Sequence, residues 1–477
     1  MLFPTVTFAL FFLIVLPLSW YFMPKPVGWR VFILGASYFF YGYWNWHFVF
    51  LLVGSTLANQ AFARAIHANE SERARRALLT AAVVLNVGLL AYFKYYDFFV
   101  SSAQNVLEHA GINVSSALLT ITLPVGISFF TFQALSYVID VYRRQFEPRP
   151  LIDFAVYLSF FPHLVAGPIV RASEFLPQLQ EKHDPRRIDA SRAFFLIGIG
   201  MFKKVVIANF LATHIVDAVF ANPGRHSSLE LLTGVYAYAV QIYADFSGYT
   251  DMAIGLALLL GFRFPQNFDS PYAATSLQNF WRRWHMTLSR WLRDYLYIPL
   301  GGNRGTPGRT YRNLMITFVL GGLWHGAAWT FVIWGAIHGG FLSFEHRQRL
   351  QREARGLEPP PDTVRRRVIQ RIAIFNVVCF AWIFFRAESL SNAFDVLRGI
   401  LDPTNWLVAS PLVTVSVVVA IAVGIGGQYM PHDVTTRLMA RFSRLNPIGA
   451  GAVLGVALLL INTMGPRGVA PFIYFKF

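Results

Sequence analysis

Two histidines that each directly follow a tryptophan, His285 and His325, could do chemistry. His325 lies in the sequence Gly321-Gly-Leu-Trp-His325-Gly, where small residues allow a backbone or a ligand to approach closely. An imidazole in apolar surroundings stays neutral, and a neutral imidazole is a competent general base. We therefore predict that His325 is the catalytic base. The alternative is a core histidine that joins two helices.

The second histidine, His285, ends a segment rich in tryptophan and arginine, Asn279-Phe-Trp-Arg-Arg-Trp-His285. The arginines in and after this segment have two interpretations that the sequence leaves open. They are either cytoplasmic loop residues, which membrane proteins enrich in Lys and Arg, or a clamp on the phosphates of a cytosolic donor. The predicted donor-binding residues are Arg282, Arg283, Arg293, Trp281 and Asn279.

Polar residues also interrupt the apolar run 231–262. Asp245 and Asp251 are six residues apart and do not share a helix face, so we expect one to cap a helix and the other to pair with an arginine. On a continuous helix, His338 would lie about 220° around from His325, which favours a structural role for His338. The predicted tunnel-lining residues are Asp245, Ser247, Trp324 and Trp329.

Several catalytic motifs are missing from the sequence. No histidine is followed by aspartate four positions later, and there is no G-x-S-x-G, H-E-x-x-H or P-loop pattern. No histidine pair has the spacing of metal ligands on a helix. Cys379, the only cysteine, lies in an apolar run and reads as a small buried residue. We therefore expect no metal site and no bound cofactor.

The composition indicates a membrane protein. Of 477 residues, 55% are hydrophobic and 14% are charged, whereas soluble domains carry about 25% charged residues. The net charge of +16 would suggest nucleic acid in a soluble protein, but basic cytoplasmic loops explain it better, so no nucleic-acid partner is expected. Hydrophobicity this high with so little charge predicts several passes through the lipid bilayer.

Apolar runs and basic loops together predict an all-α polytopic chain with about eleven or twelve crossings and one domain, residues 1–477. Runs 31–46 and 47–63 should form a tight pair, and 101–116 an outer loop. The run 151–170 has basic flanks on both sides and internal prolines, so it should be re-entrant. Runs 231–262 and 314–344 are too long for one span and should be broken. Residues 263–313 should form interfacial or re-entrant helices.

These residues resemble the membrane-bound O-acyltransferase (MBOAT) family, in particular its bacterial branch that takes part in alginate O-acetylation. The resemblance covers essentially the whole chain and is densest over 124–344. Asn279-Phe-Trp-Arg-Arg-Trp-His285, followed after 40 residues by Leu323-Trp-His325-Gly, is its most specific part.

The resemblance implies that His325 matches the family's catalytic histidine, in a tunnel through a ring of helices. It implies that His285 matches a second signature position, at which members carry Asn or His and which therefore positions a group instead of acting as a base. The activity implied is transfer of an acyl group, with acetyl from acetyl-CoA as the expected one, from the cytosol to a hydroxyl for exopolysaccharide O-acetylation.

The resemblance also implies a multi-pass protein of the bacterial inner membrane with a periplasmic or membrane-anchored partner, an SGNH-type acetyltransferase or esterase. Other acceptors stay open: peptidoglycan, cellulose or teichoic acid. A transporter is the alternative from another class, because transporters also use buried His and Asp. The polar residues of this chain gather around two histidine motifs instead of following a continuous path, which favours the enzyme.

Overall fold

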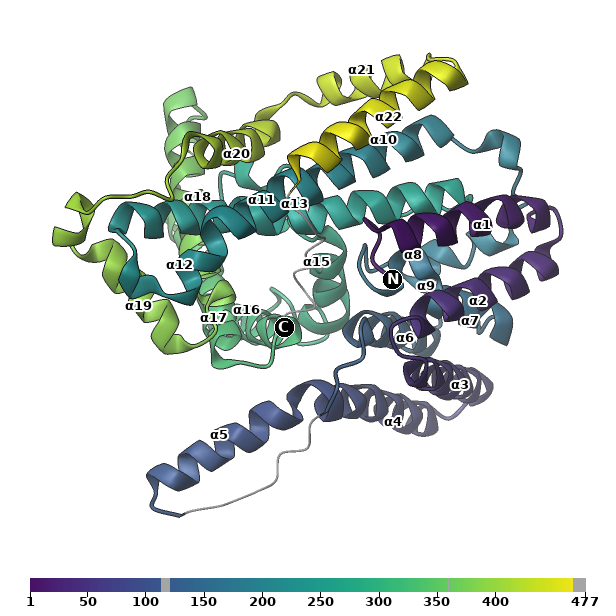
Figure 1. Cartoon of the computed structure of the whole chain (residues 1–477). Helices are drawn as coiled ribbons and strands as arrows, with labels where there is room; N and C mark the ends of the chain where they lie inside the picture. The colour runs from purple at the N-terminus through teal and green to yellow at the C-terminus, as the bar shows by residue number, and fades with distance from the viewer. Residues whose placement is uncertain (113–120, 359, 466–477) are drawn as a thin grey trace. The chain divides into compact units, whose positions relative to one another are not determined.

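The computed structural model of the chain describes residues 1–112, 121–358 and 360–465 (Figure 1). Within these ranges the secondary structure is helical and no strand occurs, which confirms the predicted all-α class. The helices group into two compact units. Unit 1 comprises Met1–Asp189 and Leu256–Pro265, and unit 2 comprises Ala190–Gly255 and Gln266–Phe477. The prediction of a single domain over 1–477 stays a prediction.

Unit 1 contains the first nine α-helices. They are α1 (Val6–Phe22), α2 (Pro26–Gly42), α3 (His47–Ala68), α4 (Glu72–Leu90), α5 (Tyr96–His109), α6 (Ile127–Tyr142), α7 (Leu151–Ser159), α8 (Phe161–Leu164) and α9 (Ala172–Phe175), with a π-helical turn, Ala91–Tyr95, between α4 and α5. The expected tight pair is confirmed as α2 and α3, which are separated by four residues.

The run 151–170 is broken, as its prolines predict. Helix α7 ends before Phe160, and α8 begins at Phe161 with Pro162 in its first turn, because proline has no backbone N–H to donate and its ring clashes with a preceding helical turn. Asp153 in α7 forms an ion pair with Arg30 of α2, with 2.8 Å between the charged atoms. The segment is buried inside unit 1, as a re-entrant segment must be.

Unit 2 carries the predicted catalytic residues. Its α-helices are α10 (Ala190–Met201), α11 (Asn209–Leu211), α12 (Asp217–Ala221), α13 (Ser228–Leu259, whose last turn belongs to unit 1), α14 (Leu277–Trp281), α15 (Met286–Leu292), α16 (Pro307–His325), α17 (Trp329–Ala354), α18 (Val364–Arg386), α19 (Leu390–Leu401), α20 (Val415–Gly426), α21 (His432–Ser443) and α22 (Pro447–Met464). Two π-helical segments, Phe202–Ala208 and Ala212–Val216, join α10, α11 and α12.

Helix α13 corrects the expectation that 231–262 is broken. It is one continuous helix of 32 residues. Its polar residues do not interrupt it because Asp245 pairs with Lys204 at 2.6 Å and Asp251 pairs with Lys203 at 2.7 Å. The expected cap and arginine partner are therefore wrong. The two aspartates each bind one of two consecutive lysines in a π-helical segment. These are side-chain contacts, so the backbone hydrogen bonds of α13 continue through both positions.

Helices α16 and α17 form a hairpin, and the break between them falls at Gly326–Ala328, inside the predicted interval. Glycines let the two helices touch through their backbones. A Cβ atom at Gly322 would lie 2.2 Å from the carbonyl oxygen of Phe331, and one at Gly335 would lie 2.3 Å from that of Phe318. His325 and His338 therefore stand on two antiparallel arms and not on one continuous helix.

Fewer described helices meet the length and hydropathy expected of a membrane span than the eleven or twelve crossings that the sequence predicts. Four helical stretches within the described ranges are long and apolar enough to cross a membrane: His47–Ala68, Glu72–His109, Ala190–Ala221 and Val364–Arg386, with a fifth if the bent pair Val415–Tyr429 and Asp433–Ser443 counts as one span. Three shorter helices are also apolar. One reason for the difference is that apolar helices such as α1 and α6 have only 17 and 16 residues.

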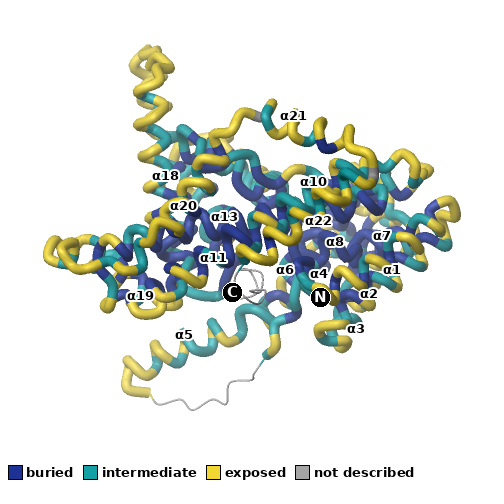
Figure 2. The backbone as a smooth tube through the Cα atoms, turned by 45° about the horizontal axis from the view of Figure 1, so that its top comes forward, coloured by how far each residue is buried: buried dark blue, intermediate teal, exposed yellow. Residues whose placement is uncertain are grey.

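The expected outer loop at 101–116 is also corrected. Residues up to His109 continue helix α5, and 113–116 lie outside the described residues. Figure 2 shows α5 as partly exposed, whereas α13 is buried along most of its length. Because it is buried along most of its length, α13 is the central helix of unit 2.

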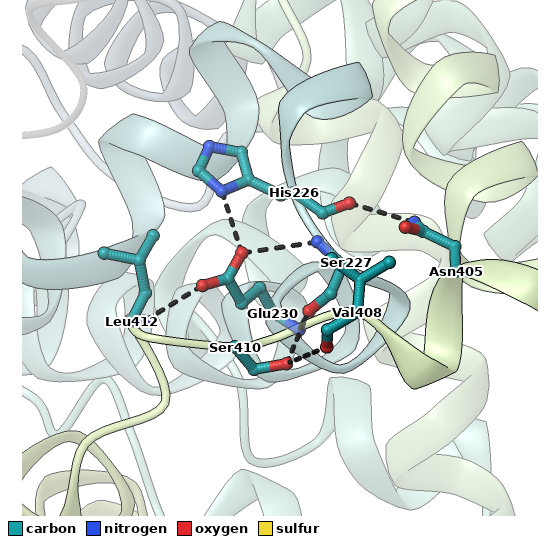
Figure 3. A network of polar contacts seen from close by, with 7 residues as sticks. All are labelled: His226, Ser227, Glu230, Asn405, Val408, Ser410 and Leu412. Carbon is teal, nitrogen blue, oxygen red and sulfur yellow. Dashed lines mark hydrogen bonds and ion pairs between the residues drawn. The ribbon is translucent and has the colours of Figure 1, made fainter.

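The start of α13 is fastened to the segment after α19 (Figure 3). Ser227 and Glu230 form a capping box: the Ser227 hydroxyl accepts from the Glu230 amide and the Glu230 carboxylate accepts from the Ser227 amide. The same carboxylate accepts from the Leu412 amide at 2.9 Å, and the Ser227 hydroxyl bonds to that of Ser410 at 2.6 Å. These bonds fix the register of α13 and hence the position of its polar residues.

Candidate active site and family

His325 is the last residue of α16 and has 3% of its surface exposed. Three aromatic rings surround its imidazole, with centroid distances of 5.0 Å to Trp324, 5.1 Å to Trp334 and 5.2 Å to Phe385. These rings come from α16, α17 and α18. The predicted base therefore stands in the apolar surroundings that the sequence suggested, at the turn of the hairpin.

The glycines beside His325 serve the backbone. A Cβ atom at Gly326 would lie 2.0 Å from the ring of Phe331. Together with the contact of Gly322 described above, this close packing brings the start of α17 against the end of α16. Of the two uses that the sequence allowed for these glycines, close approach of a ligand or of a backbone, the structure supplies the second.

His285 has no exposed surface and lies between α14 and α15 in left-handed backbone conformation, with φ 41° and ψ 54°. Its ring meets Phe246 of α13 edge-on at 4.6 Å and lies 6.2 Å from Trp324. Trp324 is thus a common neighbour of His285 and His325. The structure brings the two signature histidines to one indole from separate segments of unit 2.

Asn267 is a site residue that the sequence reasoning missed. It is fully buried, and its Oδ1 atom lies 3.1 Å from His285 Nδ1. The Met286 amide also donates to the Asn267 carbonyl oxygen. A lone asparagine in a loop carries no signal of its own, although it falls within 124–344, where the resemblance to the family is densest.

His338 lies in α17 and is also fully buried. Its Nδ1 atom accepts a hydrogen bond from the indole N–H of Trp281 at 3.3 Å. The Trp334 ring lies 4.8 Å from His338 and 5.1 Å from His325. Trp281 also packs against Phe318, so this predicted donor-binding residue sits in the packing between α14 and the hairpin.

The predicted arginines differ in what they contact. Arg282 is exposed. Arg283 is half-buried and donates to the carbonyl of Asp269 at 3.3 Å. Arg293 is exposed and holds the carboxylate of its neighbour Asp294 with two bonds, of 2.6 and 3.1 Å. Arg282 and Arg293 are therefore both exposed, and Arg293 is the one already paired with a carboxylate.

The remaining predicted residues are spread more widely. Asp245 is tied to Lys204, and Ser247 is buried on the same helix. Trp329 begins α17 with 55% of its surface exposed, whereas Trp324 is buried. Asn279 is half-buried in α14, where its amide donates to the hydroxyl of the capping residue Ser276. The roles of these residues in lining a tunnel or binding the donor stay predictions.

Two other features bear on ligands. In the turn at 301–305, the amides of Gly301, Gly302 and Arg304 donate to backbone carbonyls at 297, 298 and 301, so they are already bonded within the chain instead of facing a phosphate. Within the described ranges, no group of three or more His, Cys, Asp or Glu side chains could hold a metal ion.

The buried His325 at the turn of the hairpin and His285 in the Trp-rich segment have Trp324 as a common neighbour, and these two histidines belong to the two motifs that carry the family resemblance most specifically. Residues 84–387 match the sequence profile of the "MBOAT, membrane-bound O-acyltransferase family". The chain belongs to this family. It is an O-acyltransferase and a multi-pass membrane protein.

The names of individual relatives also specify the transfer of an acyl group. The chain is 41% identical over 402 residues to "Probable alginate O-acetylase AlgI" of Azotobacter vinelandii, covering 83% of this chain and 77% of the relative. It is 39% identical to "Peptidoglycan O-acetyltransferase" of Helicobacter pylori, covering 79% and 74%. It is 28% identical to "Teichoic acid D-alanyltransferase" of Streptococcus thermophilus, covering 57% and 70%.

Proposed function

We propose that this protein moves an acetyl group from a cytosolic thioester, acetyl-CoA, across the inner membrane to a hydroxyl, for O-acetylation of an alginate-like exopolysaccharide. The observation that carries the proposal is the similarity, over about four fifths of the chain, to two relatives whose names both specify O-acetyl transfer. The relative with a different acyl group in its name is less similar and matches a smaller part of the chain.

In the proposed reaction, His325 takes the proton of the attacking hydroxyl. The hydroxyl oxygen forms a bond to the thioester carbonyl carbon, the carbon–sulfur bond breaks, and the thiol of the donor leaves with a proton. The aromatic shell of Trp324, Trp334 and Phe385 supports this role because it keeps bulk water away from the imidazole. His285 contributes a hydrogen bond near the same indole and does not act as the base.

The donor should bind on the side of the Trp-rich segment. Arg282 supports this because its charge is accessible, and Arg283 stands beside it in sequence. Phosphate groups of a cytosolic donor would pair with such guanidinium groups by charge-assisted hydrogen bonds. The hydroxyl that receives the acetyl group would belong to a periplasmic or membrane-anchored SGNH-type partner, which passes the group on to the polymer.

A second acceptor has direct support. The relative named "Peptidoglycan O-acetyltransferase" is nearly as similar to this chain as the relative named for alginate. Peptidoglycan is therefore the first alternative polymer, ahead of cellulose and teichoic acid. The histidine chemistry proposed here is the same for each of these hydroxyls.

The proposal is tested with inside-out membrane vesicles that contain the protein, supplied with acetyl-CoA labelled in the acetyl group. Wild-type vesicles should release free CoA thiol and accumulate alkali-labile labelled ester, and His325→Ala vesicles with the same protein content should not. Acetylated acyl carrier protein, given in place of acetyl-CoA, tests the other cytosolic thioester.

Two results would count against the proposal. One is ester formation only when the vesicles have the opposite orientation, which would place the donor site in the periplasm. The other is the absence of thiol release with either thioester in the presence of alginate, peptidoglycan fragments and extracts of periplasm.

A further inference from the structure

The side-chain oxygen of Asn267 collects three bonds from the segment that begins with His285. Oδ1 accepts from the Thr287 amide at 3.1 Å and from the Thr287 hydroxyl at 2.8 Å, and it lies 3.1 Å from His285 Nδ1. The amide nitrogen of Asn267 faces the other way and donates to the hydroxyl of Thr250 on α13 at 3.4 Å. Asn267 thus ties the start of α15 to α13.

These partners settle which end of the Asn267 amide points to His285. A backbone N–H can only donate, so the atom that faces the Thr287 amide must be the oxygen. Turning the amide around would set its NH2 group against that N–H. An amide oxygen only accepts, and His285 Nδ1 must therefore carry a hydrogen.

The proton on Nδ1 determines what the other ring nitrogen can do. A neutral imidazole has one N–H, so His285 Nε2 carries a lone pair and accepts. Nε2 is buried and has no hydrogen-bond partner among the described residues. It belongs to a ring that touches Phe246 and neighbours Trp324, which in turn adjoins His325. A buried acceptor of this kind is costly unless a ligand group satisfies it.

His285 is better suited to accept a hydrogen bond than to take a proton. Burial lowers the pKa of the His285 imidazole to about 3. A base works best when its pKa is near the working pH, so this ring is a weak base at neutral pH. It lies between two short helices that are outside the candidate spans, and no acidic side chain bonds to it among the described contacts.

The backbone at His285 gives an independent reason for the residue types that the position accepts. A φ of 41° places it in the left-handed region, where Asn, Asp and His are enriched among residues other than glycine. Asparagine can adopt this backbone and can present its side-chain oxygen as an acceptor in place of Nε2. Alanine offers neither property.

We propose that Asn267 is the positioning residue of His285: it fixes the Nδ1–H tautomer, so that Nε2 accepts a hydrogen bond from an O–H or N–H group of a substrate beside His325. The proposal rests on the proposed acyl transfer. The donor group is either the attacking hydroxyl or an amide N–H of the thioester, and the kinetic measurements below distinguish these two sources.

The tautomer is tested without any activity measurement. The whole protein in lipid, labelled with ¹⁵N-histidine, is measured by solid-state NMR, and His285 is assigned as the signal lost in His285→Asn. The wild type should show a protonated Nδ1 and an unprotonated Nε2. A protonated Nε2 with an unprotonated Nδ1 overturns the proposal at once, whether or not the protein transfers acetyl groups. Asn267→Ala should convert the His285 signals to a mixture of tautomers.

The positioning role is tested by kinetics with a matched control. Asn267→Ala should lower kcat/KM about tenfold, the effect expected from one hydrogen bond. In the His285→Asn background the same substitution should cost less than threefold, because no tautomer is left to fix. The control Thr287→Val removes one bond to the same oxygen but not the one to the imidazole, and it should leave kcat/KM within about twofold.

The kinetic outcomes distinguish the two possible hydrogen-bond donors of the substrate from each other and from a purely structural role of Asn267. A fall in kcat with unchanged donor KM assigns the bond to the attacking hydroxyl, and a rise in donor KM assigns it to the thioester amide. An equal loss in both backgrounds means that Asn267 only supports the fold and overturns the proposal. Absence of acetyl transfer in the wild type refutes the proposed function, while the NMR result still decides the tautomer.

Discussion

His285 and His338 are both completely buried in unit 2, and each has its Nδ1 atom bonded to one side chain, but the two partners have opposite chemistry. The amide oxygen of Asn267 accepts, so His285 holds its proton on Nδ1. The indole N–H of Trp281 donates, so His338 Nδ1 must carry the lone pair and Nε2 the proton. One ring is left as an acceptor and the other as a donor.

The comparison teaches that the side chain bonded to Nδ1 decides which ring nitrogen of a buried histidine carries the proton, whereas burial and the adjacent sequence do not. Both histidines stand near tryptophans in apolar surroundings, and both are close to His325, through Trp324 for one and Trp334 for the other. Only the fixed proton distinguishes them. Predictions about the three histidines should therefore differ in size and in kind.

The largest effect should come from substitution of His325, the predicted base, which has both Trp324 and Trp334 as neighbours. His325→Ala should lower kcat about 10²–10⁴-fold, because a general base contributes a factor of this size. The measurement is single-turnover acetyl transfer by purified protein whose monodispersity matches the wild type. Near-normal turnover in His325→Ala together with complete loss in His285→Asn would exchange the roles of these two histidines.

The second effect concerns the charges that accompany His285 and not His338. Arg282→Gln combined with Arg283→Gln should raise the donor KM about tenfold or more with a smaller change in kcat, because a charge-assisted contact contributes roughly 1.5–3 kcal/mol. Arg293→Gln should do less, since Asp294 already holds that guanidinium. An unchanged donor KM in the double variant would show that these arginines do not bind the donor and are ordinary basic residues of a cytoplasmic loop.

The third prediction compares substitutions at His285. His285→Asn should keep activity within about threefold of the wild type, while His285→Ala should lose about tenfold or more through the missing hydrogen bond. His285→Gly separates the two causes, because glycine relieves the left-handed backbone but restores no acceptor. Recovery of activity in the glycine variant would show that backbone strain, and not the hydrogen bond, limits His285→Ala.

The smallest effect should come from substitution of Trp281, the hydrogen-bond partner of His338. Trp281→Phe removes the N–H that fixes His338 and should cost about 1 kcal/mol of stability, the usual value of one hydrogen bond. Activity per folded molecule at saturating donor should be retained, because phenylalanine keeps an aromatic ring at this predicted donor-binding position. The check is thermal unfolding in detergent beside an activity measurement on the same sample. A loss of turnover without a loss of stability would give His338 a part in the chemistry and end the contrast with His285.

Local patterns predicted several elements of the fold well. The break in 151–170 follows from its prolines, and the break between α16 and α17 follows from glycines around His325. Cys379 is buried, as its apolar run indicated. These features depend on backbone preferences of a few neighbouring residues, which are present in the sequence itself.

Long-range partners explain the wrong predictions. Helix α13 was expected to break at Asp245, because nothing near it in the sequence shows that Lys204 lies opposite. For α13, the missing information was which segments pack together. The angle of about 220° between His325 and His338 applied only to a continuous helix, and the chain has the break that was predicted within 314–344, so the structural role of His338 stays a prediction.

The sequence by itself determined that the chain is a helical membrane protein, and its resemblance to a known family gave the O-acyltransferase class and the candidate site residues His325 and His285. It could do so because hydropathy, charge and short motifs are properties of residues close together in the chain. Only the tertiary structure decided that Asn267 faces His285 and Trp281 faces His338. A hydrogen bond depends on a few ångströms and on direction, and the partners here are 18 and 57 residues apart in the chain. Packing alone therefore placed the proton on a different nitrogen in each ring.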